Sequence, residues 1–587
     1  MQEITSNMIY NAILLAAEEI KINKNHLNEV NYFPVPDNDT GENLAHLMQR
    51  IARDIRKKDN IKDMLNMVSD SSIKGSRGNS GAIFSQFFQG FEEKCPDKDS
   101  LYISELVACF ESGSKYAYSA LEKPVEGTIL TAISSFAESL KSFDKMDTSL
   151  EDIFDNAFRN LQSTVEKTKY ILKAKVDVQK EDAGALGFMY FVQGFIKGIK
   201  GKEASQTSGE YLDILDETAL IKDSYHIVDD FKYCTEILLK NSIEIQKQEL
   251  IHSLKKYGES IVITENKNFR RIHIHSNDPR EVIDYLSHLG QILEVKADDM
   301  VLQQRLSKES DSEIGIVIDS IADLPLENLP DFVYMLPLNM IIDGVSYQDK
   351  RTVPKDLAGI NNITSSQPNL DEINKFLYPI FKRHKHILVL TVLSKMSGLY
   401  ERYTDFKKLN PDMSLEIIDT KLNSVAEGLL VCNTIQKLKA GLDFNQLIGY
   451  VESSIRRTKI FVSIKNLDGM VKSGRLNKKI GWALQKVGFL PLITIDQEGN
   501  GTIKRTAFTQ KGNYKNLLKE IEENKDKIDS YALVHVNNIP KIHELEEHLS
   551  KSLGFPPLYI SEISSIVENF SGEGSIAIGY QLKENYE

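Results

Sequence analysis

Cysteine is scarce in this sequence, and the few cysteines present are far apart. The 587 residues contain four of them, and no two form a CxxC pair. This spacing argues against a disulfide framework or a compact cysteine-rich metal motif, so we expect a reducing, cytoplasmic environment. The four are Cys95, Cys109, Cys234 and Cys432.

Long apolar runs and basic tracts are also missing. No run approaches the roughly 18 apolar residues of a membrane span, so we expect at most peripheral membrane contact. The formal net charge of −13, without a basic cluster, argues against nucleic acid as a partner. The N-terminus has no basic segment and no small-residue cleavage site, so no signal peptide is expected.

What the sequence does contain is three successive patterns. Residues 1–203 carry apolar residues at three- and four-residue spacing, which predicts helices. Residues 213–306 mix short β-like runs with helical ones, which predicts a small α/β domain. Strands and helices alternate over residues 313–587, as is typical of parallel-sheet α/β architecture. We therefore expect a multidomain protein of α and α/β parts.

The stretch FPVPDNDTGENL ends one helical segment with two prolines and then presents two aspartates. Asp37 and Asp39 are hard oxygen donors one residue apart, a pair suited to Mg²⁺ bound together with ATP. Thr40 and Gly41 open the next helix, whose N-terminal amides favour phosphate. A doubled turn and helix cap would explain the two aspartates about equally well.

Three more glycine-rich breaks interrupt the helical region: KGSRGNSGA, KPVEGT and EDAG. In the first, Gly75, Gly78 and Gly81 allow close backbone approach, and Asn79 and Ser80 supply donors. None is a GxxxxGK[ST] phosphate loop. One such break alone is more simply a helix-connecting loop, but the whole set on one helical region favours a nucleotide site.

These breaks resemble motifs of the ATP-binding DhaL (Dak2-type) domain of bacterial fatty acid kinases. NYFPVPDNDTGENL is similar to NVFPVPDGDTGTNM, GSRGNSGAIFSQFFQGF to GARGNSGxxxSQxFRGF, and EDAGALG to DSGGKG, while KPVEGTILT matches outright. The resemblance implies an antiparallel all-α helical barrel that binds ATP and two Mg²⁺ ions, with Asp37 and Asp39 as metal ligands and catalytic residues. The residues it places near the nucleotide are Thr40, Gly41, Asn43, Gly78, Asn79, Ser80, Gly81, Thr128, Asp182 and Gly184.

The sequence departs from this pattern at four positions. Asn38 replaces the glycine between the aspartates, and Glu42 replaces a small polar residue close to the phosphates. Ala185 and Leu186 stand where the last motif has small and polar residues. These changes leave ATP binding expected and bear on catalytic efficiency.

The middle region carries RRIHIHSND, which puts His273 and His275 on one face of an expected strand. Cys234 is a candidate third ligand with the softness that zinc accepts. Two half-exposed surface histidines are the simpler interpretation of this spacing alone. The YCTE stretch and the HxH strand are similar to the middle domain of fatty acid kinases, and this resemblance implies a zinc site at these three residues.

In the C-terminal region, Asp319, Ser320 and Asp323 follow an expected strand, where ligands of open α/β sheets bind but where helix caps also occur. Further small polar clusters are TSSQP, SKMSGLY, DTKLNS and VKSGRLN. Such hydroxyls beside apolar walls could hold a carboxylate and its hydrophobic chain, although generic loops share the pattern.

This region resembles the DegV fatty-acid-binding family over about residues 313–585. VIDSIADLP is similar to VTDSTADLP, SSQP to TSQP, and SKMSGLY to SSxLSGTY. The resemblance implies a two-lobed α/β fold, and Arg505 becomes a further candidate for the head group or kinase docking. The family's HxGPG stands here as FSGEG, with Phe570 for histidine and Glu573 for proline. The fatty-acid-binding residues it implies are Ser320, Thr364, Ser365, Ser366, Ser397, Gly398 and Arg475.

Together the resemblances imply a fused fatty acid kinase that uses ATP and Mg²⁺ to make acyl phosphate for lipid synthesis. Two alternatives stay open: a non-catalytic fatty-acid carrier or sensor with a vestigial ATP site, and a kinase of a dihydroxyacetone-type small molecule. The expected partners are a fatty acid, ATP, separate DegV-type proteins, an acyl-phosphate acyltransferase and a second copy of the chain in a homodimer.

Overall fold

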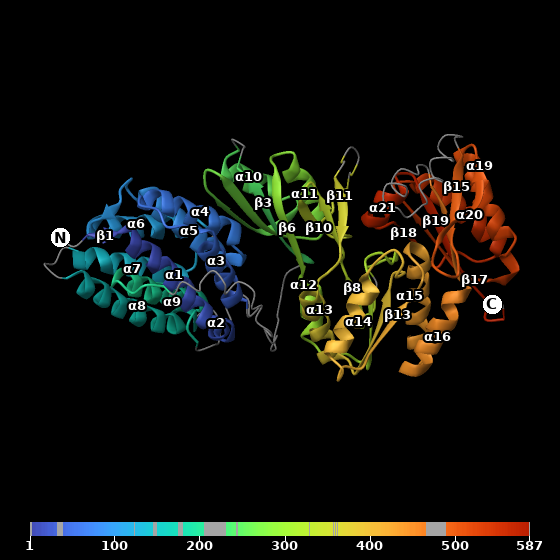
Figure 1. Ribbon diagram of the computed structural model, residues 1–587, viewed down its shortest axis with the longest axis horizontal. Helices are drawn as coiled ribbons and strands as arrows, with labels where there is room; N and C mark the ends of the chain where they lie inside the picture. The colour runs from blue at the N-terminus through green and yellow to red at the C-terminus, as the bar shows by residue number, and fades with distance from the viewer. Residues whose placement is uncertain are drawn as a thin grey trace. The chain divides into compact units, whose positions relative to one another are not determined.

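The computed structural model divides the chain into two compact units, residues 1–307 and 308–587 (Figure 1). No helix in the described part of the chain is both long and apolar enough to cross a membrane. The structure describes residues 3–31, 39–121, 124–144, 149–173, 180–204, 231–241, 245–327, 329–355, 357, 360, 362–464 and 489–585.

The first unit begins with the predicted helical region, drawn in blue to cyan in Figure 1. Two short strands, β1 (Ile4–Thr5) and β2 (Ser100–Leu101), pair antiparallel. The helices are α1 (Ser6–Ile22), α2 (Lys24–Val30), α3 (Thr40–Asp54), α4 (Ile61–Gly75), α5 (Gly78–Lys94), α6 (Ile103–Tyr118), α7 (Ile129–Asp144), α8 (Leu150–Lys173) and α9 (Ala183–Ile199).

Glycine and phenylalanine explain how these helices pack. A Cβ on Gly198 of α9 would lie 2.2 Å from the backbone nitrogen of Ala12 on α1, so only glycine permits this approach. The interior between α5, α6, α7 and α9 is aromatic, and tilted or edge-on ring pairs of this kind stabilise a core beyond their buried area. Its fully buried rings are Phe84, Phe87, Phe110, Phe136, Phe188 and Phe191.

The rest of the first unit is the expected small α/β region, whose three predicted strand segments are confirmed. Its sheet has the order β4-β5-β3-β6, and every neighbouring pair is antiparallel. The sheet contacts α4, because Asn266 and Asn268 both donate to Asp70. The elements are β3 (Tyr233–Lys240), α10 (Lys247–Leu254), β4 (Gly258–Glu265), β5 (Phe269–Ser276), α11 (Pro279–Ser287), β6 (Ile292–Asp299) and α12 (Met300–Leu306).

The second unit starts with a parallel sheet of order β13-β12-β7-β8, as the alternating pattern predicts. A small antiparallel sheet, β10-β9-β11, accompanies it. The elements are β7 (Ile314–Asp319), β8 (Val333–Leu336), β9 (Asn339–Ile342), β10 (Val345–Gln348), β11 (Ile363–Ser366), α13 (Leu370–Arg383), β12 (His386–Thr391), α14 (Leu399–Leu409), β13 (Leu415–Asp419), α15 (Ser424–Lys439) and α16 (Phe444–Arg457).

The second lobe corrects the expectation of parallel sheets throughout residues 313–587. Its sheet has the order β16-β15-β14-β19-β17-β18, and only β17 and β18 run parallel. The last strand inserts between β14 and β17 and is antiparallel to both. The elements are β14 (Thr458–Ser463), β15 (Leu490–Ile495), β16 (Gly501–Ala507), α19 (Gln510–Glu522), β17 (Ile528–His535), α20 (Ile539–Leu553), β18 (Ile560–Glu562), α21 (Ser565–Ser571) and β19 (Ile576–Leu582).

The two lobes of this unit share one apolar core. Val425, Leu429 and Leu430 of α15 are fully buried in a cluster that also contains Ile316 of β7 and Ala577 of β19. Because α15 starts at Ser424, this packing holds a polar helix N-terminus at the junction of both lobes.

Candidate functional site

The predicted magnesium ligands lie at the start of α3. Asp37 and Asn38 are outside the described residues. Asp39 is the N-cap residue of α3, and its carbonyl oxygen accepts from Asn43 N at 2.8 Å. The described residues thus include one aspartate of the predicted pair, at a helix start.

Gly41 and Glu42 are engaged with α2. The backbone nitrogens of both donate to Asn28 Oδ1, at 2.8 and 3.2 Å. A Cβ on Gly41 would lie 2.1 Å from Lys24 O, so this glycine lets α3 pack on α2. Glu42 forms an ion pair with Lys24 at 3.1 Å, which directs its carboxylate to α2.

The starts of α3 and α5 meet at Gly78. Its φ of +56° lies in the left-handed region that favours glycine. A Cβ there would lie 2.8 Å from Asn43 Nδ2, so two predicted phosphate-binding segments, one from each helix, are in contact. Asn79 is exposed and Ser80 half-buried in the first turn of α5, which also contains Gly81. A helix start of this kind suits an anionic ligand.

Two of the other predicted nucleotide residues form bonds inside the fold. Asp182 is the N-cap of α9 and accepts from Ala185 N at 2.8 Å. Burial raises its pKa to about 7, although backbone amides donating to the carboxylate oppose that shift. Thr128 Oγ1 donates to Val125 O at 2.7 Å, and a Cβ on Gly184 would lie 3.1 Å from Ile129 Cβ. The structure therefore gives Asp182 and Thr128 capping and turn bonds.

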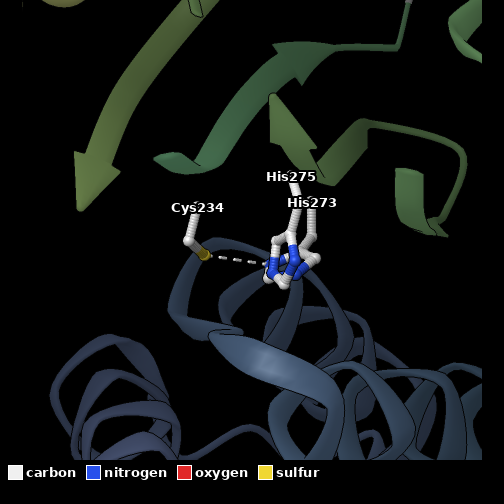
Figure 2. A group of neighbouring side chains, drawn as sticks. All are labelled: Cys234, His273 and His275. Carbon is white, nitrogen blue, oxygen red and sulfur yellow. Dashed lines mark hydrogen bonds between the residues drawn. The ribbon is translucent and has the colours of Figure 1, made fainter. Parts of the chain in front are cut away.

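The middle region brings Cys234, His273 and His275 together, as Figure 2 shows. Cys234 on β3 and His275 on β5 are cross-strand partners, and one ligand atom from each of the three residues lies within 4.8 Å of the others. Cys234 Sγ is 3.7 Å from His273 Nδ1, close to the roughly 3.6 Å between sulfur and nitrogen ligands of tetrahedral zinc. Burial raises the pKa of Cys234. One thiol and two imidazoles thus fit zinc and leave a fourth position for another ligand.

The second unit contains an enclosed cavity of about 280 Å³. Ser365 and Ser366 at the end of β11 line it together with Ser397, so three of the predicted carboxylate-binding residues are brought together. The remaining wall is mostly apolar and comes from both lobes. Its apolar members include Leu338, Val392, Leu399, Ile460, Val462, Ile493 and Ile563. A cavity with few polar groups and long apolar walls suits an amphiphilic ligand.

The other predicted residues of this region have different positions. Ser320 is fully buried, and its Oγ accepts from Leu338 N at 3.2 Å. Thr364 is exposed, whereas a Cβ on Gly398 would meet the side chain of Gln367, which lines the cavity. Arg475 lies outside the described residues. Arg505 forms ion pairs with Glu520 and Glu523 on and just after α19.

Buried aspartates tie the cavity loops together. Asp319 accepts from Ile321 N and Val392 N, both at 2.9 Å, so it joins two segments that line the cavity. Asp323 accepts from Ser564 N at 2.8 Å and pairs with Lys350 at 3.1 Å. Burial raises the pKa of Asp319 to about 6. The capping interpretation is thus the one that the contacts support for both.

Several cavity residues escaped the sequence reasoning. Asn423 and Ser424, from the DTKLNS cluster, line the cavity, as do Phe570 and Ser571 in place of the missing histidine motif. The Ser571 hydroxyl is buried and has no hydrogen-bond partner within the described parts of the chain. The small polar clusters were the signal for the first pair, while no sequence pattern singled out Ser571.

Comparison with known families identifies the regions in order along the chain. The DAK2 domain model matches residues 34–197, and the FakA-like middle-domain model of fatty acid kinases matches residues 230–307. The DegV family model matches residues 313–583. The chain is thus a fusion of fatty acid kinase-type domains with a DegV domain, which confirms the resemblance of its motifs.

Curated relatives include Protein YloV of Bacillus subtilis, 27% identical over 357 residues, with 57% of this chain and 63% of the relative covered. An uncharacterized protein of Staphylococcus aureus strain MRSA252 is 26% identical over 319 residues, covering 52% and 57%. The chain thus spans less than two thirds of the length of these relatives.

Solved structures with detectable similarity include a fatty acid binding DegV family protein from Streptococcus agalactiae. It is 27% identical, has a TM-score of 0.43 and covers 46% of this chain and 99% of its own. The Fatty Acid Kinase B3 protein of Streptococcus pneumoniae, loaded with linoleic acid, is 19% identical with a TM-score of 0.42, covering 46% and 99%.

Proposed function

We propose that the protein is an ATP-dependent kinase that phosphorylates the carboxylate of a fatty acid bound in its DegV domain. The observation that carries the proposal is the serine-lined apolar cavity on a chain that also has DAK2 and fatty acid kinase-type middle domains. Hydroxyls donate to a carboxylate while apolar walls accommodate an acyl chain. DegV proteins described as binding fatty acids support this choice of ligand.

The chemistry requires no general base. A fatty acid carboxylate is ionised at neutral pH, since carboxyl pKa values lie near 4. One carboxylate oxygen forms a bond to the γ-phosphorus of ATP. The bond from that phosphorus to the bridging oxygen breaks, so that ADP leaves and an acyl phosphate remains. Positioning and charge stabilisation then account for most of the catalysis.

In the helical domain, Asp37 and Asp39 would hold Mg²⁺, which supplies charge neutralisation on the phosphates. Asn79 and Ser80 would orient the phosphates at the start of α5, beside Asn43. Glu42 is turned to Lys24, which supports a working site despite the change from the family pattern.

For the middle domain we propose a zinc ion held by Cys234, His273 and His275. The donor set and the 3.7 Å separation of Cys234 Sγ and His273 Nδ1 support zinc. Metal analysis of protein purified without chelator tests this: about one zinc per chain is expected, and Cys234→Ser should lose it. Wild-type protein without zinc would sink the assignment.

Fusion makes the encounter of the two substrates intramolecular. A short tether gives an effective concentration on the order of millimolar. Transfer within one chain or between the protomers of a homodimer is compatible with the sequence. The acyl phosphate would be used by an acyltransferase, and separate DegV-type proteins are further candidate donors of fatty acid.

The test incubates purified protein with Mg-ATP and oleate and traps acyl phosphate as a hydroxamate. We expect hydroxamate from wild type, none from Asp37→Asn or Asp39→Asn, and unchanged yield from Asp63→Asn, an exposed carboxylate of the same domain. Bound fatty acid without hydroxamate would instead favour a carrier or sensor. Turnover of dihydroxyacetone but not oleate would favour a small-molecule kinase.

A further inference from the structure

One face of the middle sheet carries more than the metal-binding residues. Side chains two residues apart on a strand share a face, so Glu236 lies beside Cys234 on β3. Arg271 likewise lies beside His273 on β5. Glu236 and His273 are cross-strand partners, and His273 Nδ1 is 3.6 Å from Glu236 Oε1. The metal cluster and this acidic residue therefore form one continuous polar patch.

Glu236 and Arg271 form a buried ion pair. Arg271 Nη2 lies 3.0 Å from Glu236 Oε2, and the two side chains are only 4% and 8% exposed. Arg271 Nη2 also donates to Glu294 Oε1 at 3.1 Å. Because burying two charges is costly, such a pair needs its remaining donors and acceptors satisfied as well.

The remaining bonds of this pair go to the helical domain. Arg271 Nη1 donates to the carbonyl oxygen of Lys74 at 3.0 Å, and the backbone nitrogen of Gly78 donates to Glu236 Oε1 at 3.0 Å. The ion pair thus holds both ends of residues 74–78, the segment that joins α4 to α5. We call this segment the α4–α5 loop.

The same loop is held from the other side by α3. His46 Nδ1 lies 2.9 Å from the carbonyl oxygen of Gly75. Gly78 faces Asn43, as its missing Cβ would lie 2.8 Å from Asn43 Nδ2. Immediately after the loop come Asn79 and Ser80, which begin the helix that the phosphates are proposed to approach.

We propose that Glu236 and Arg271 are positioning residues for the nucleotide site, acting as a clamp that sets the conformation of the α4–α5 loop. The clamp rests on the proposed function, since it presents the first turn of α5 to the phosphates of ATP. Preorganising a binding segment strengthens binding by removing the ordering cost. The middle domain is therefore an integral part of the kinase site, contributing two side chains that hold its loop.

Glu236→Gln tests the clamp, because it keeps an acceptor for Gly78 N while removing the charge that faces Arg271. The matched control is Glu265→Gln, which breaks the ion pair between Glu265 and Arg270 (2.6 Å) in the same sheet. Glu265 and Arg270 make no bond to the α4–α5 loop among the described contacts. If Glu236→Gln folds poorly, the double variant Glu236→Gln/Arg271→Met removes both charges and avoids an unpaired buried one.

Three readouts separate positioning from stability. In nucleotide-free protein, we expect faster hydrogen exchange of residues 74–81 in Glu236→Gln and not in Glu265→Gln. The Kd for a fluorescent ADP with Mg²⁺ should rise about tenfold, which corresponds to about 1.4 kcal/mol. Oleate binding should stay unchanged in both variants, as the cavity lies in the second unit.

Unchanged exchange and unchanged nucleotide Kd in both clamp variants would overturn the proposal. Tighter nucleotide binding in Glu236→Gln would overturn it too, because Glu236 would then compete with phosphate at the Gly78 amide. A wild-type protein that binds no Mg-nucleotide refutes the proposed function, and the clamp's role at a nucleotide site with it. Normal nucleotide binding by wild type and by both clamp variants refutes the clamp alone.

Discussion

The serines predicted in the DegV domain and the polar residues predicted in the helical domain differ in what their atoms contact. Ser365, Ser366 and Ser397 gather around a cavity, so their hydroxyls border open space. Gly41 and Asp182 instead have their polar atoms bonded to Asn28 and Ala185 of the fold itself. Short motifs at helix and strand ends therefore mix ligand-binding residues with residues that build the turn, and the contacts separate the two.

The sharpest way to break this comparison is Gly41→Ala. Its new Cβ would lie 2.1 Å from Lys24 O, which is backbone and cannot give way. We expect a loss of about 3 kcal/mol in the free energy of unfolding, as for a severe overpacking change. Thermal melts measure it, with Asn79→Ala as the control that should leave the melting temperature unchanged. A Gly41→Ala protein of wild-type stability would contradict the packing role.

Asp182 gives the next largest effect. Asp182→Ala removes the cap of α9 and should cost about 2 kcal/mol of unfolding free energy. Burial raises the pKa of Asp182 to about 7 from 3.8. Between these pH values the folded protein keeps a proton that the unfolded chain releases, so this group's contribution to stability falls as the pH rises.

Asp182→Asn tests that pH dependence, since the amide can cap the helix but has no proton to lose. Melts at pH 5 and pH 7.5 should show a smaller decline for Asp182→Asn than for wild type. Parallel declines in the two proteins would show that Asp182 is already ionised across this range.

Two serine substitutions sharpen the comparison within the DegV domain. Ser365→Ala/Ser366→Ala should weaken oleate binding about tenfold, or about 1.4 kcal/mol, with no loss of stability. Ser320→Ala should do the reverse, costing about 1 kcal/mol of unfolding free energy while oleate binding persists, since its hydroxyl bonds to Leu338 N. Titration with a fluorescent fatty acid and thermal melts check both. Equal effects on both readouts would erase the distinction.

The smallest expected effect is at Ser571. Its hydroxyl has no partner among the described residues, so Ser571→Ala loses no hydrogen bond of the fold. We expect oleate binding to weaken about threefold, less than 1.4 kcal/mol, if this hydroxyl contributes to the head-group site. Unaltered binding would leave the predicted serines as the sole hydroxyl donors tested.

Much of the fold was predictable because the signals are local. Three- and four-residue apolar spacing predicted the helices of the first region, and period-two runs predicted β4, β5 and β6. The antiparallel sheet of the second lobe was not, since β19 pairs with β14 across more than a hundred residues. Strand direction depends on such non-local pairing, which an alternating strand–helix pattern does not encode.

The metal cluster and the cavity serines were predictable for a similar reason, namely that their motifs are short and family-specific. Glu236 and Arg271 were missed, although the alternation that paired His273 with His275 places them on the same face. What was missing was the partner: nothing in β3 or β5 indicates that the patch packs against the α4–α5 loop.

By itself the sequence determined the three-part organisation, the regions that form helices and strands, and the residues from which nucleotide, metal and fatty-acid sites could be built. Tertiary structure alone decided which of those residues bond to the fold, which of them border a cavity, and that Glu236 meets Gly78. The physical reason is that a polar atom's role depends on whether a partner from a distant segment already satisfies it, and chain packing places that partner.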